Sequence, residues 1–269
     1  MERRNFLAST LAASAAGLGA SLAAFPGPQN AADTATREYY ELRCYHLNSG
    51  PQVKAIHEYF RGALLPALNR LSISPVGVFS VVIGPENPSI YLLLPSQSPE
   101  NLVNSRLLLE RDDEYMKAGA AFLNAPAAAP AFVRVESSLM IAFKGQPRLT
   151  IPPATAGHQA RVFELRTYES PSDQDHIRKI EMFHSGEFDI FEKAGFWPVF
   201  YGDTLIGPRL PNLTYMLGFS DLAERNKLWE AFGSAPEWKK LTGSPRFAFE
   251  AIVSNITNLI LSPTPYSQI

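Results

Sequence analysis

The chain carries an internal repeat of constant register. Residues 40–45 (YELRCY) return as residues 163–168 (FELRTY), a shift of 123 from residue 40 to residue 163. The same shift relates the Ile83-Gly84-Pro85 turn to Ile206-Gly207-Pro208, and residues 114–117 (EYMK) to residues 237–240 (EWKK). A register kept from residue 40 to residue 117 indicates one structural unit written twice, so each copy must fold in the same way.

The two copies share one predicted order of elements: strand, helix, strand, strand, helix, strand. Alternating polar and apolar residues predict the strands, and an N-cap at Ser172 with a stop at Gly195 delimits one helix. The predicted elements of the first copy are 38–46, 51–71, 76–83, 89–94, 99–121 and 132–143. Those of the second copy are 160–168, 172–194, 198–206, 213–219, 221–241 and 247–261. This order is the ferredoxin-like motif.

A single ferredoxin-like unit covers one face of its sheet with two helices and leaves the other face bare. Two units can bury their bare faces against each other. We therefore predict an α+β fold in which two four-stranded sheets pack face to face with the helices outside, as an intramolecular pseudo-dimer. The expected parts are a first domain (37–145), a Pro-rich linker (146–159), a second domain (160–263) and a short tail (264–269).

The N-terminal residues have the features of an export signal. Arg3 and Arg4 precede Phe6-Leu7 and a stretch of Leu, Ala, Ser and Gly that carries no charge until Asp33. This layout is that of a secretory signal, and the paired arginines resemble the bacterial twin-arginine signal. We expect residues 1–36 to be a leader and the mature chain to be periplasmic or extracellular. The alternative is an uncleaved signal that tethers the chain to a membrane.

Composition excludes several classes of function. The formal net charge is −2, so no basic surface for nucleic acid is expected. Cys44 is the only cysteine, which rules out an intrachain disulfide and a cysteine-based metal cluster. The sequence has no Gly-x-Ser-x-Gly elbow, phosphate loop or dinucleotide fingerprint. We expect no metal, no cofactor and no stable membrane span once the leader is removed.

Several segments of the second copy resemble the NIPSNAP family. They are residues 163–168 (FELRTY), 206–208 (IGP), 219–225 (FSDLAER), 236–238 (PEW) and 258–263 (NLILSP). The first copy is more divergent: residues 98–101 (SPEN) replace the DLAE stretch, and Tyr115 stands where the family prefers Trp. The resemblance implies two tandem NIPSNAP-type domains of the dimeric α/β-barrel, ferredoxin-like superfamily.

The resemblance leaves two functions open. NIPSNAP proteins are described mostly through protein interactions and vesicle or organelle biology, which implies an exported protein that binds a small ligand or a protein partner. The superfamily also contains cofactor-free monooxygenases, haem-degrading and haem-binding enzymes and isomerases, with sites between sheet and helices. The alternative is therefore a cofactor-independent monooxygenase or isomerase acting on an aromatic or quinone-like molecule.

Two polar residues fall on the apolar stripe of the second copy's first helix. At 100° per residue, His184 and Glu187 lie within the stripe that runs from Ile177 to Ala194. One turn apart, they could pair or converge on a ligand. The alternatives are a hydrogen-bonded pair at the stripe's edge or an interface contact, and His-x-x-Glu lacks the third ligand that zinc requires. Matching the stripes with a shift of 124 places Phe60 and Ala63 at the equivalent positions of the first copy.

The opening strands supply further candidates. Strand alternation puts Glu164, Arg166 and Tyr168 on one face, as it does for Glu41, Arg43 and Tyr45. If that face turned into the barrel, the Glu-Arg pair could orient a carboxylate ligand; the alternative is a structural ion pair. Tyr201 and Trp197 could line an aromatic cavity, although core packing explains them equally well. We predict that any site is asymmetric and belongs mainly to residues 160–262.

Overall fold

The computed structural model describes residues 36–48 and 50–269. The predicted export signal lies outside the described residues. Within the described part, none of the helices is long and apolar enough to cross a membrane.

The first copy has the expected element order, with its helices divided into short pieces. Its strands are β1 (Tyr39–His46), β2 (Gly77–Ile83), β3 (Ser89–Ser96) and β4 (Arg134–Ala142). The first helical region comprises α1 (Pro51–Tyr59), a π-helical turn η1 (Phe60–Leu64) and α2 (Leu65–Arg70). The second comprises α3 (Pro99–Val103), α4 (Ser105–Leu109), α5 (Asp113–Ala118) and α6 (Ala120–Leu123).

The second copy repeats this plan after a one-turn helix α7 (Pro153–Ala156) in the linking segment. Its strands are β5 (Val162–Glu169), β6 (Trp197–Ile206), β7 (Asn212–Phe219) and β8 (Asn255–Pro263). The first helical region comprises α8 (Asp173–Met182), a π-helical turn η2 (Phe183–Glu187) and α9 (Phe188–Ala194). The second comprises α10 (Leu222–Ser234), α11 (Pro236–Thr242), a 3-10 turn η3 (Pro245–Phe247) and α12 (Phe249–Ile252).

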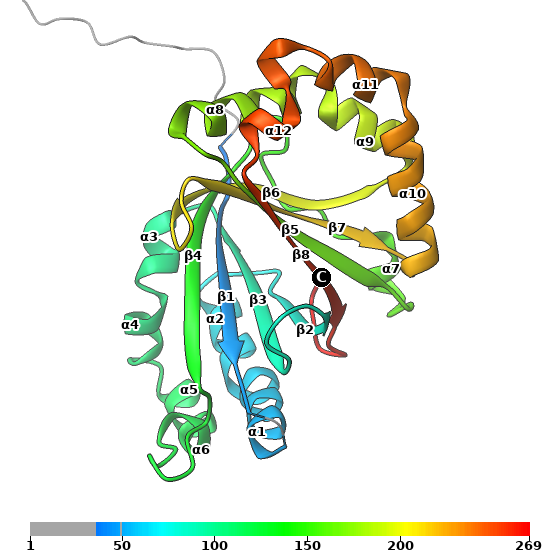
Figure 1. The fold of residues 1–269 in the computed structure, drawn as a ribbon. Coiled ribbons are helices and arrows are strands. Elements are labelled where there is room, and N and C mark those ends of the chain that lie inside the picture. Colours follow the sequence, from blue (N-terminus) through cyan, green and yellow to red (C-terminus); the bar gives the residue numbers. More distant parts are fainter. Residues whose placement is uncertain (1–35, 49) are drawn as a thin grey trace, which may run out of the picture. The chain divides into compact units, whose positions relative to one another are not determined.

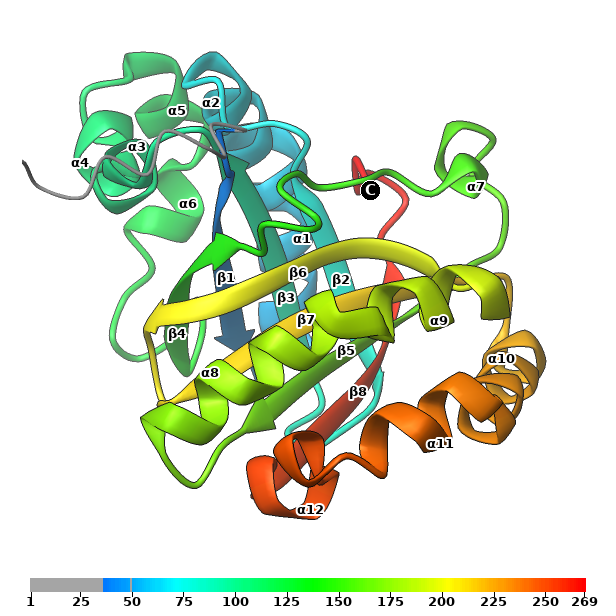
Figure 2. The same ribbon diagram turned by 90° about the horizontal axis from the view of Figure 1, so that it is seen from above.

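All eight strands close into one antiparallel barrel in the order β1-β3-β2-β8-β5-β7-β6-β4. Each copy contributes four neighbouring strands, and the copies join at two seams, β2 with β8 and β4 with β6. Helices α1–α6 cover the strands of the first copy, and α8–α12 cover those of the second (Figures 1 and 2). The α+β barrel predicted from the repeat is confirmed, with the two sheets continuous at both seams.

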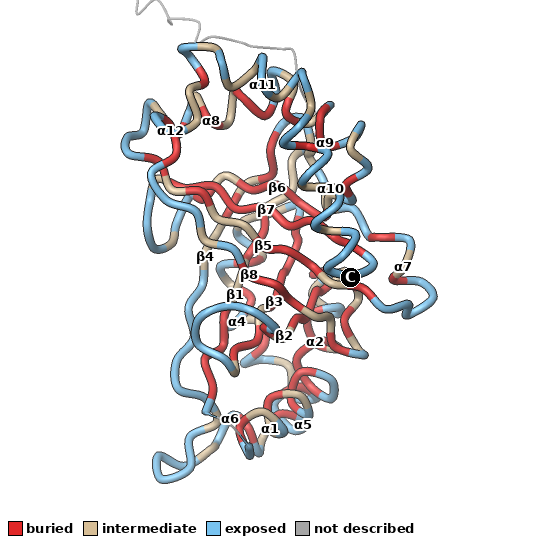
Figure 3. Tube along the Cα trace, turned by 45° about the vertical axis from the view of Figure 1, so that its right-hand side comes forward, coloured by how far each residue is buried: buried red, intermediate tan, exposed pale blue. Residues whose placement is uncertain are grey.

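The barrel separates three apolar cores. An inner core lies inside the barrel and includes Tyr40, Phe79, Phe163 and Phe200. Two outer cores lie between the strands and the helices of the first and the second copy. In Figure 3 the buried colour follows the strands and the inward faces of the helices, and the exposed colour lies on the outside.

Strand alternation decides which side chains reach each core. In β1, Tyr40 belongs to the inner core and Tyr45 to the outer one. The face that carries Glu41, Arg43 and Tyr45 therefore turns toward the helices, not into the barrel. The same holds for Glu164, Arg166 and Tyr168 of β5, because Phe163 and Leu165 belong to the inner core.

Two further predicted elements, both in the second copy, differ from the structure. The second helix of the second copy breaks between α10 and α11, because Pro236 lacks a backbone N–H and disfavours helical geometry at Ala235, whose ψ is 130°. The last strand begins at Asn255 instead of residue 247. Residues 245–252 form the turns η3 and α12, which bury Phe247 and Ile252 against the helices of the second copy.

The π-helical turns correct the predicted helix face. They occupy residues 60–64 and 183–187, so they are related by the same shift of 123, and the shift of 124 used to match the stripes is wrong. A π turn adds one residue to a helical turn and so rotates everything before it relative to a regular helix. Buried positions in α8 are His176, Lys179 and Met182, whereas the predicted Ile177 is exposed.

The position of Cys44 gives a prediction for the barrel interior. Cys44 shares the inward face of β1 with Tyr40 and Leu42, and burial raises the pKa of its thiol to about 11. Because the thiolate is the reactive form, we expect the native thiol to react with Ellman's reagent at pH 8 at least about tenfold more slowly than the urea-unfolded thiol. The rate should rise with pH, since thiolate forms as pH approaches the pKa. Equal rates in the native and unfolded protein would contradict the burial of this thiol.

Candidate functional site

Most residues proposed from sequence lie in the outer core of the second copy. Tyr168, Glu187 and Tyr201 are buried between the strands and helices α8–α11, and Arg166 lies beside them with 11% of its side chain exposed. Arg166 donates from Nε and Nη2 to the Tyr168 hydroxyl at 3.1 and 3.0 Å. Tyr201 packs parallel to Tyr215 with ring centroids 5.3 Å apart. Trp197 is separate: it is 39% exposed at the start of β6.

His184 and Glu187 point in different directions, contrary to the prediction. His184 is exposed on the outside of η2, where Nδ1 lies 2.8 Å from the Ile180 carbonyl and Nε2 accepts a hydrogen bond from the Gly145 amide. Glu187 points inward and is 1% exposed. With the shift of 123, the first-copy equivalents are Arg61 and Leu64, not Phe60 and Ala63. His184 therefore cannot act with Glu187 on a common ligand in this geometry.

The partner of Glu187 is Lys179. Lys179 Nζ donates to Glu187 Oε2 at 2.6 Å, and neither side chain is more than 2% exposed. Burial lowers the pKa of Lys179 and raises that of Glu187, because each charge leaves water; the attraction between the two charges opposes both shifts. The Lys179 ammonium also lies 4.4 Å from the Phe183 ring centroid. This pair replaces Ile56 and Leu64 of the first copy.

The Glu-Arg pair of β5 is covered by side chains from α10. Glu164 accepts from Arg166 Nη1 at 2.9 Å, from Arg225 Nη2 at 2.6 Å and from the Trp229 indole at 2.6 Å. The Trp229 ring lies 4.4 Å from the Arg166 guanidinium carbon, which is a cation–π contact. Every acceptor position around Glu164 is occupied, and Trp229 covers Arg166. The space between β5 and α10 is therefore filled by side chains.

The equivalent space between the strands and helices of the first copy is not filled by side chains. A cavity of about 610 Å³ lies between β1, β4 and helices α1–α6. Its lining includes Glu41 and Arg43, which correspond to Glu164 and Arg166. The position of Trp229 is taken by Arg106, whose side chain is 79% exposed and pairs with Glu110 instead of covering Arg43. We predicted a site mainly in residues 160–262 of the second copy, but this cavity lies in the first copy.

One wall of the cavity is polar, and its positive and negative charges balance each other. We call it the polar wall. Arg43 donates from Nε and Nη2 to the two oxygens of Glu41 at 2.5 and 2.8 Å, and from Nη2 to Ser105 Oγ at 2.8 Å. Ser137 donates to Glu41 Oε1 at 2.7 Å. Burial alone would lower the pKa of Arg43, but the hydrogen bonds and charge of Glu41 outweigh it and raise the pKa. The wall is therefore polar without a net charge.

Two tyrosine hydroxyls complete this wall. The hydroxyls of Tyr59 and Tyr115 lie 2.6 Å apart. Burial raises the pKa of both, so both are neutral. One of their two hydrogens forms the bond between them, and the other can be donated to a ligand oxygen. The cavity thus offers neutral hydrogen-bond donors beside a guanidinium whose charge is already balanced.

The mouth of the cavity is apolar and exposed. Five large apolar side chains line it and each is at least 37% exposed: Val103, Leu123, Phe132, Val135 and Ile206. Ile206 comes from β6 of the second copy and reaches the mouth through the β4–β6 seam. An apolar ligand can therefore contact apolar side chains from the opening to the polar wall.

We did not predict this cavity from the sequence, because we took clustered aromatic residues as a possible sign of a ligand cavity. In the second copy those residues fill the layer. The available signal was the difference between the copies: Trp229 and Trp238 become Arg106 and Tyr115, and Tyr201 becomes Val78. Smaller or outward-pointing replacements at covering positions leave space above Arg43. Among the described residues, no group of three or more His, Cys, Asp or Glu side chains is arranged to hold a metal ion.

The sequence profile of the NIPSNAP family matches residues 163–268. This segment is the second copy of the repeat, from β5 to the chain end. Residues 163–268 form a NIPSNAP domain. The match begins at Phe163, so the first copy lies outside it. Comparison with curated proteins gave no match.

Solved structures share the fold of the whole barrel. A proposed monooxygenase from Fusobacterium nucleatum has a TM-score of 0.55 at 8% identity, over 85% of this chain and 93% of that one. Another from Lactobacillus acidophilus has a TM-score of 0.53 at 7% identity, over 84% and 94%. A NIPSNAP-like domain protein from Burkholderia xenovorans is 21% identical over 41% of this chain and 90% of that one, with a TM-score of 0.37. The first two show the fold alone.

The buried ion pair of the NIPSNAP domain can be compared with its apolar equivalent in the first copy. Replacing Glu187 alone by Leu should cost about 3–5 kcal/mol of unfolding free energy, because Lys179 is left as an unpaired buried charge. The double variant Lys179→Ile/Glu187→Leu copies Ile56 and Leu64 and should be neutral or more stable by about 1–4 kcal/mol. Urea denaturation measures both.

The exposed pair Lys193–Glu237 of the same domain is the control. Replacing Lys193 by Met should change the unfolding free energy by less than about 1 kcal/mol. A double variant at residues 179 and 187 that is as unstable as the Glu187 single variant would show that the pair stabilises the domain beyond balancing its own charges.

Proposed function

We propose that the chain binds a neutral, mainly apolar small molecule with a carbonyl or hydroxyl oxygen in the cavity of the first copy. The observation that carries the proposal is the composition of that cavity: an apolar mouth leads to a polar wall without net charge. The volume of about 610 Å³ lies within the range of small-molecule sites.

The polar wall favours a neutral oxygen over a carboxylate. The guanidinium of Arg43 already forms two hydrogen bonds to Glu41. A carboxylate ligand would have to displace Glu41 or lie beside it in a poorly solvated space, and both cost free energy. A ketone or alcohol oxygen needs only a donor, which the Tyr59–Tyr115 pair supplies.

Binding accounts for the cavity better than turnover by a cofactor-independent monooxygenase or isomerase does. Proton abstraction from a substrate needs a base within hydrogen-bond reach. Glu41 is the carboxylate of the polar wall, and it accepts hydrogen bonds from Arg43 and Ser137. Its oxygens are therefore already engaged by donors of the protein and are not directed at a substrate. Product formation from a ketone or quinone incubated with the protein would favour the catalytic alternative instead.

Export by the twin-arginine signal remains a prediction, based on Arg3 and Arg4. The binding proposal does not depend on it, because the cavity is formed entirely by residues of the barrel and its helices.

The filled second copy shows how to close the cavity. The variant Arg106→Trp places an indole where Trp229 covers Arg166 in the other copy. We expect the wild-type protein to bind the fluorescent naphthyl ketone prodan with a blue shift in emission, and the variant to lose more than about tenfold in affinity. Fluorescence titration measures both.

The matched control is Lys227→Trp, which adds a tryptophan to an exposed position of α10 in the second copy. It should bind prodan as the wild type does. Absence of prodan binding to the wild type, or equal binding by wild type and Arg106→Trp, would contradict the proposed site.

The tyrosine pair makes a second prediction about the ligand oxygen. Tyr59→Phe and Tyr115→Phe each leave one hydroxyl that can donate, so each should retain most of its affinity for prodan. The double variant removes both donors and should lose the net value of one neutral hydrogen bond, about 0.5–1.5 kcal/mol, or roughly two- to twelvefold in Kd.

Tyr266→Phe is the matched control, because the Tyr266 hydroxyl contacts His57 Nδ1 at 2.5 Å, outside the cavity. Equal affinities for the double variant and this control would show that the hydroxyl pair does not bind the ligand.

A further inference from the structure

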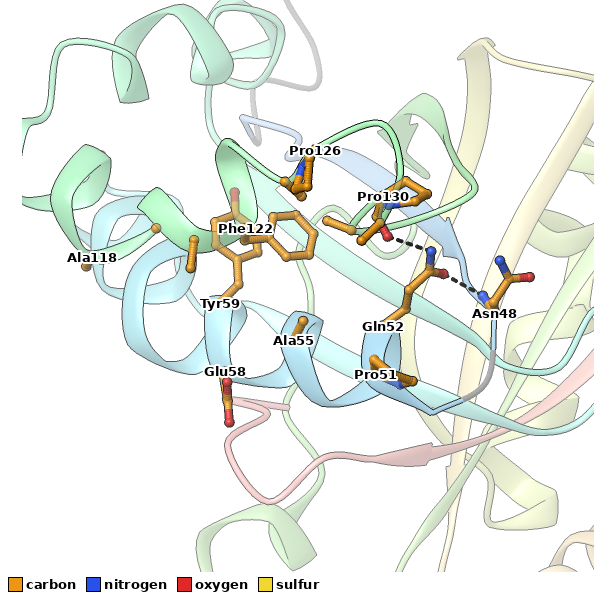
Figure 4. Close-up of a pocket in the computed structure, with 15 residues that line it drawn as sticks. Asn48, Pro51, Gln52, Ala55, Glu58, Tyr59, Ala118, Phe122, Pro126 and Pro130 are labelled. Carbon is orange, nitrogen blue, oxygen red and sulfur yellow. Dashed lines mark hydrogen bonds between the residues drawn. The ribbon is translucent and has the colours of Figure 1, made fainter.

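A second hollow lies on the outside of the first copy, next to the cavity. It is a groove of about 520 Å³ between α1, α6 and the loop of residues 124–131 (Figure 4). Alanine, proline and aromatic side chains form most of its lining. The side-chain amide of Gln52 already has two hydrogen-bond partners. It donates to the Pro130 carbonyl at 2.7 Å and accepts from the backbone N–H of Asn48 at 2.6 Å. The groove therefore offers mainly apolar contact.

Two aromatic side chains form the wall that the groove shares with the cavity. Tyr59 and Phe122 line both hollows. Their rings are parallel, with centroids 4.1 Å apart and an angle of 1° between the planes. Figure 4 shows the Phe122 ring over Tyr59 and toward Pro126. On the cavity side Phe122 also packs on Phe132, with centroids 5.9 Å apart. The two hollows are thus separated by one pair of stacked rings.

The wall is anchored differently on its two sides. Tyr59 belongs to the long first helical region, and its hydroxyl is hydrogen-bonded to the hydroxyl of Tyr115. Phe122 belongs to α6, a helix of four residues, and the following residues 124–133 contain no helix or strand. Rotation of the Phe122 side chain, or a small shift of α6, leaves every hydrogen bond of the barrel strands intact. Phe122 is therefore the movable side of the wall.

We propose that the ligand of the cavity is a linear molecule with an oxygen near one end, and that its apolar chain passes Phe122 into the groove. The inference rests on the proposed function and names the ligand class for the same site. Displacing the Phe122 ring joins the two hollows, and a flexible alkyl chain is the ligand group that can follow a passage made by moving a single ring. The oxygen lies at the Tyr59–Tyr115 hydroxyls, and the chain extends along the alanine and proline surface of the groove.

A series of methyl ketones of increasing chain length tests this. Each buried methylene should tighten binding about fourfold, measured by displacement of prodan. In the wild type this gain should continue for chains that are too long for the cavity. In Ala121→Trp, which fills the groove from an exposed position, the gain should stop at the length that fills the cavity, and short ketones should bind unchanged. Ala127→Trp, in the loop of residues 124–131 but outside the groove lining, is the matched control and should follow the wild type.

Phe122→Ala removes the wall and provides a second test. Long ketones should gain affinity relative to short ones, because the passage no longer requires the ring to move. If wild type, Ala121→Trp and Phe122→Ala all show the same dependence on chain length, the groove takes no part and this inference is overturned. Short ketones that still bind and still lose affinity in Arg106→Trp would leave the proposed function standing. Failure of short ketones and prodan to bind would contradict the proposed function itself.

Discussion

Closure of the barrel is the constraint on which the rest of the structure depends. A four-stranded ferredoxin-like sheet has a bare face and two edges with unpaired backbone groups. The seams β2–β8 and β4–β6 pair the edges of both copies, and the same closure buries both bare faces in the inner core of Tyr40, Phe79, Phe163 and Phe200. Because Tyr40 and Phe163 turn into this core, strand alternation places Glu41 and Arg43 of β1, and Glu164 and Arg166 of β5, on the helix side. Both copies therefore carry a Glu-Arg pair between strands and helices.

The two copies differ in the side chains that cover the Glu-Arg pair. In the NIPSNAP domain, Trp229 stacks on Arg166 and donates to Glu164, so the layer is packed. In the first copy, Arg106 points to solvent and Arg43 faces an open cavity. The charge of Arg43 is balanced by Glu41, which makes the cavity suited to a neutral ligand. The duplicated scaffold thus has packed side chains around Glu164 and Arg166 in one copy and space for a small molecule beside Glu41 and Arg43 in the other.

Most of the fold could be predicted from the chain because strands and turns follow local patterns. The constant shift of 123 and the alternation in residues 40–45 and 163–168 were sufficient for element order and fold class. The helix face was wrong because a π turn adds one residue, so the regular 100° spacing placed His184 inward and missed Lys179. The start of the last strand was wrong because Phe247 and Ile252 pack as helical turns against distant helices.

By itself, the sequence determined the duplication, the ferredoxin-like order of each copy, the α+β barrel and the NIPSNAP character of residues 163–268. Tertiary structure decided which face of β1 meets the helices, which carboxylate Lys179 binds, and that the cavity lies in the first copy. The physical reason is that secondary structure depends on periods of two or about four residues, which a sequence displays directly. A cavity is the difference between the space that the backbone encloses and the volume of side chains brought together from distant segments, such as Arg43, Arg106 and Phe122.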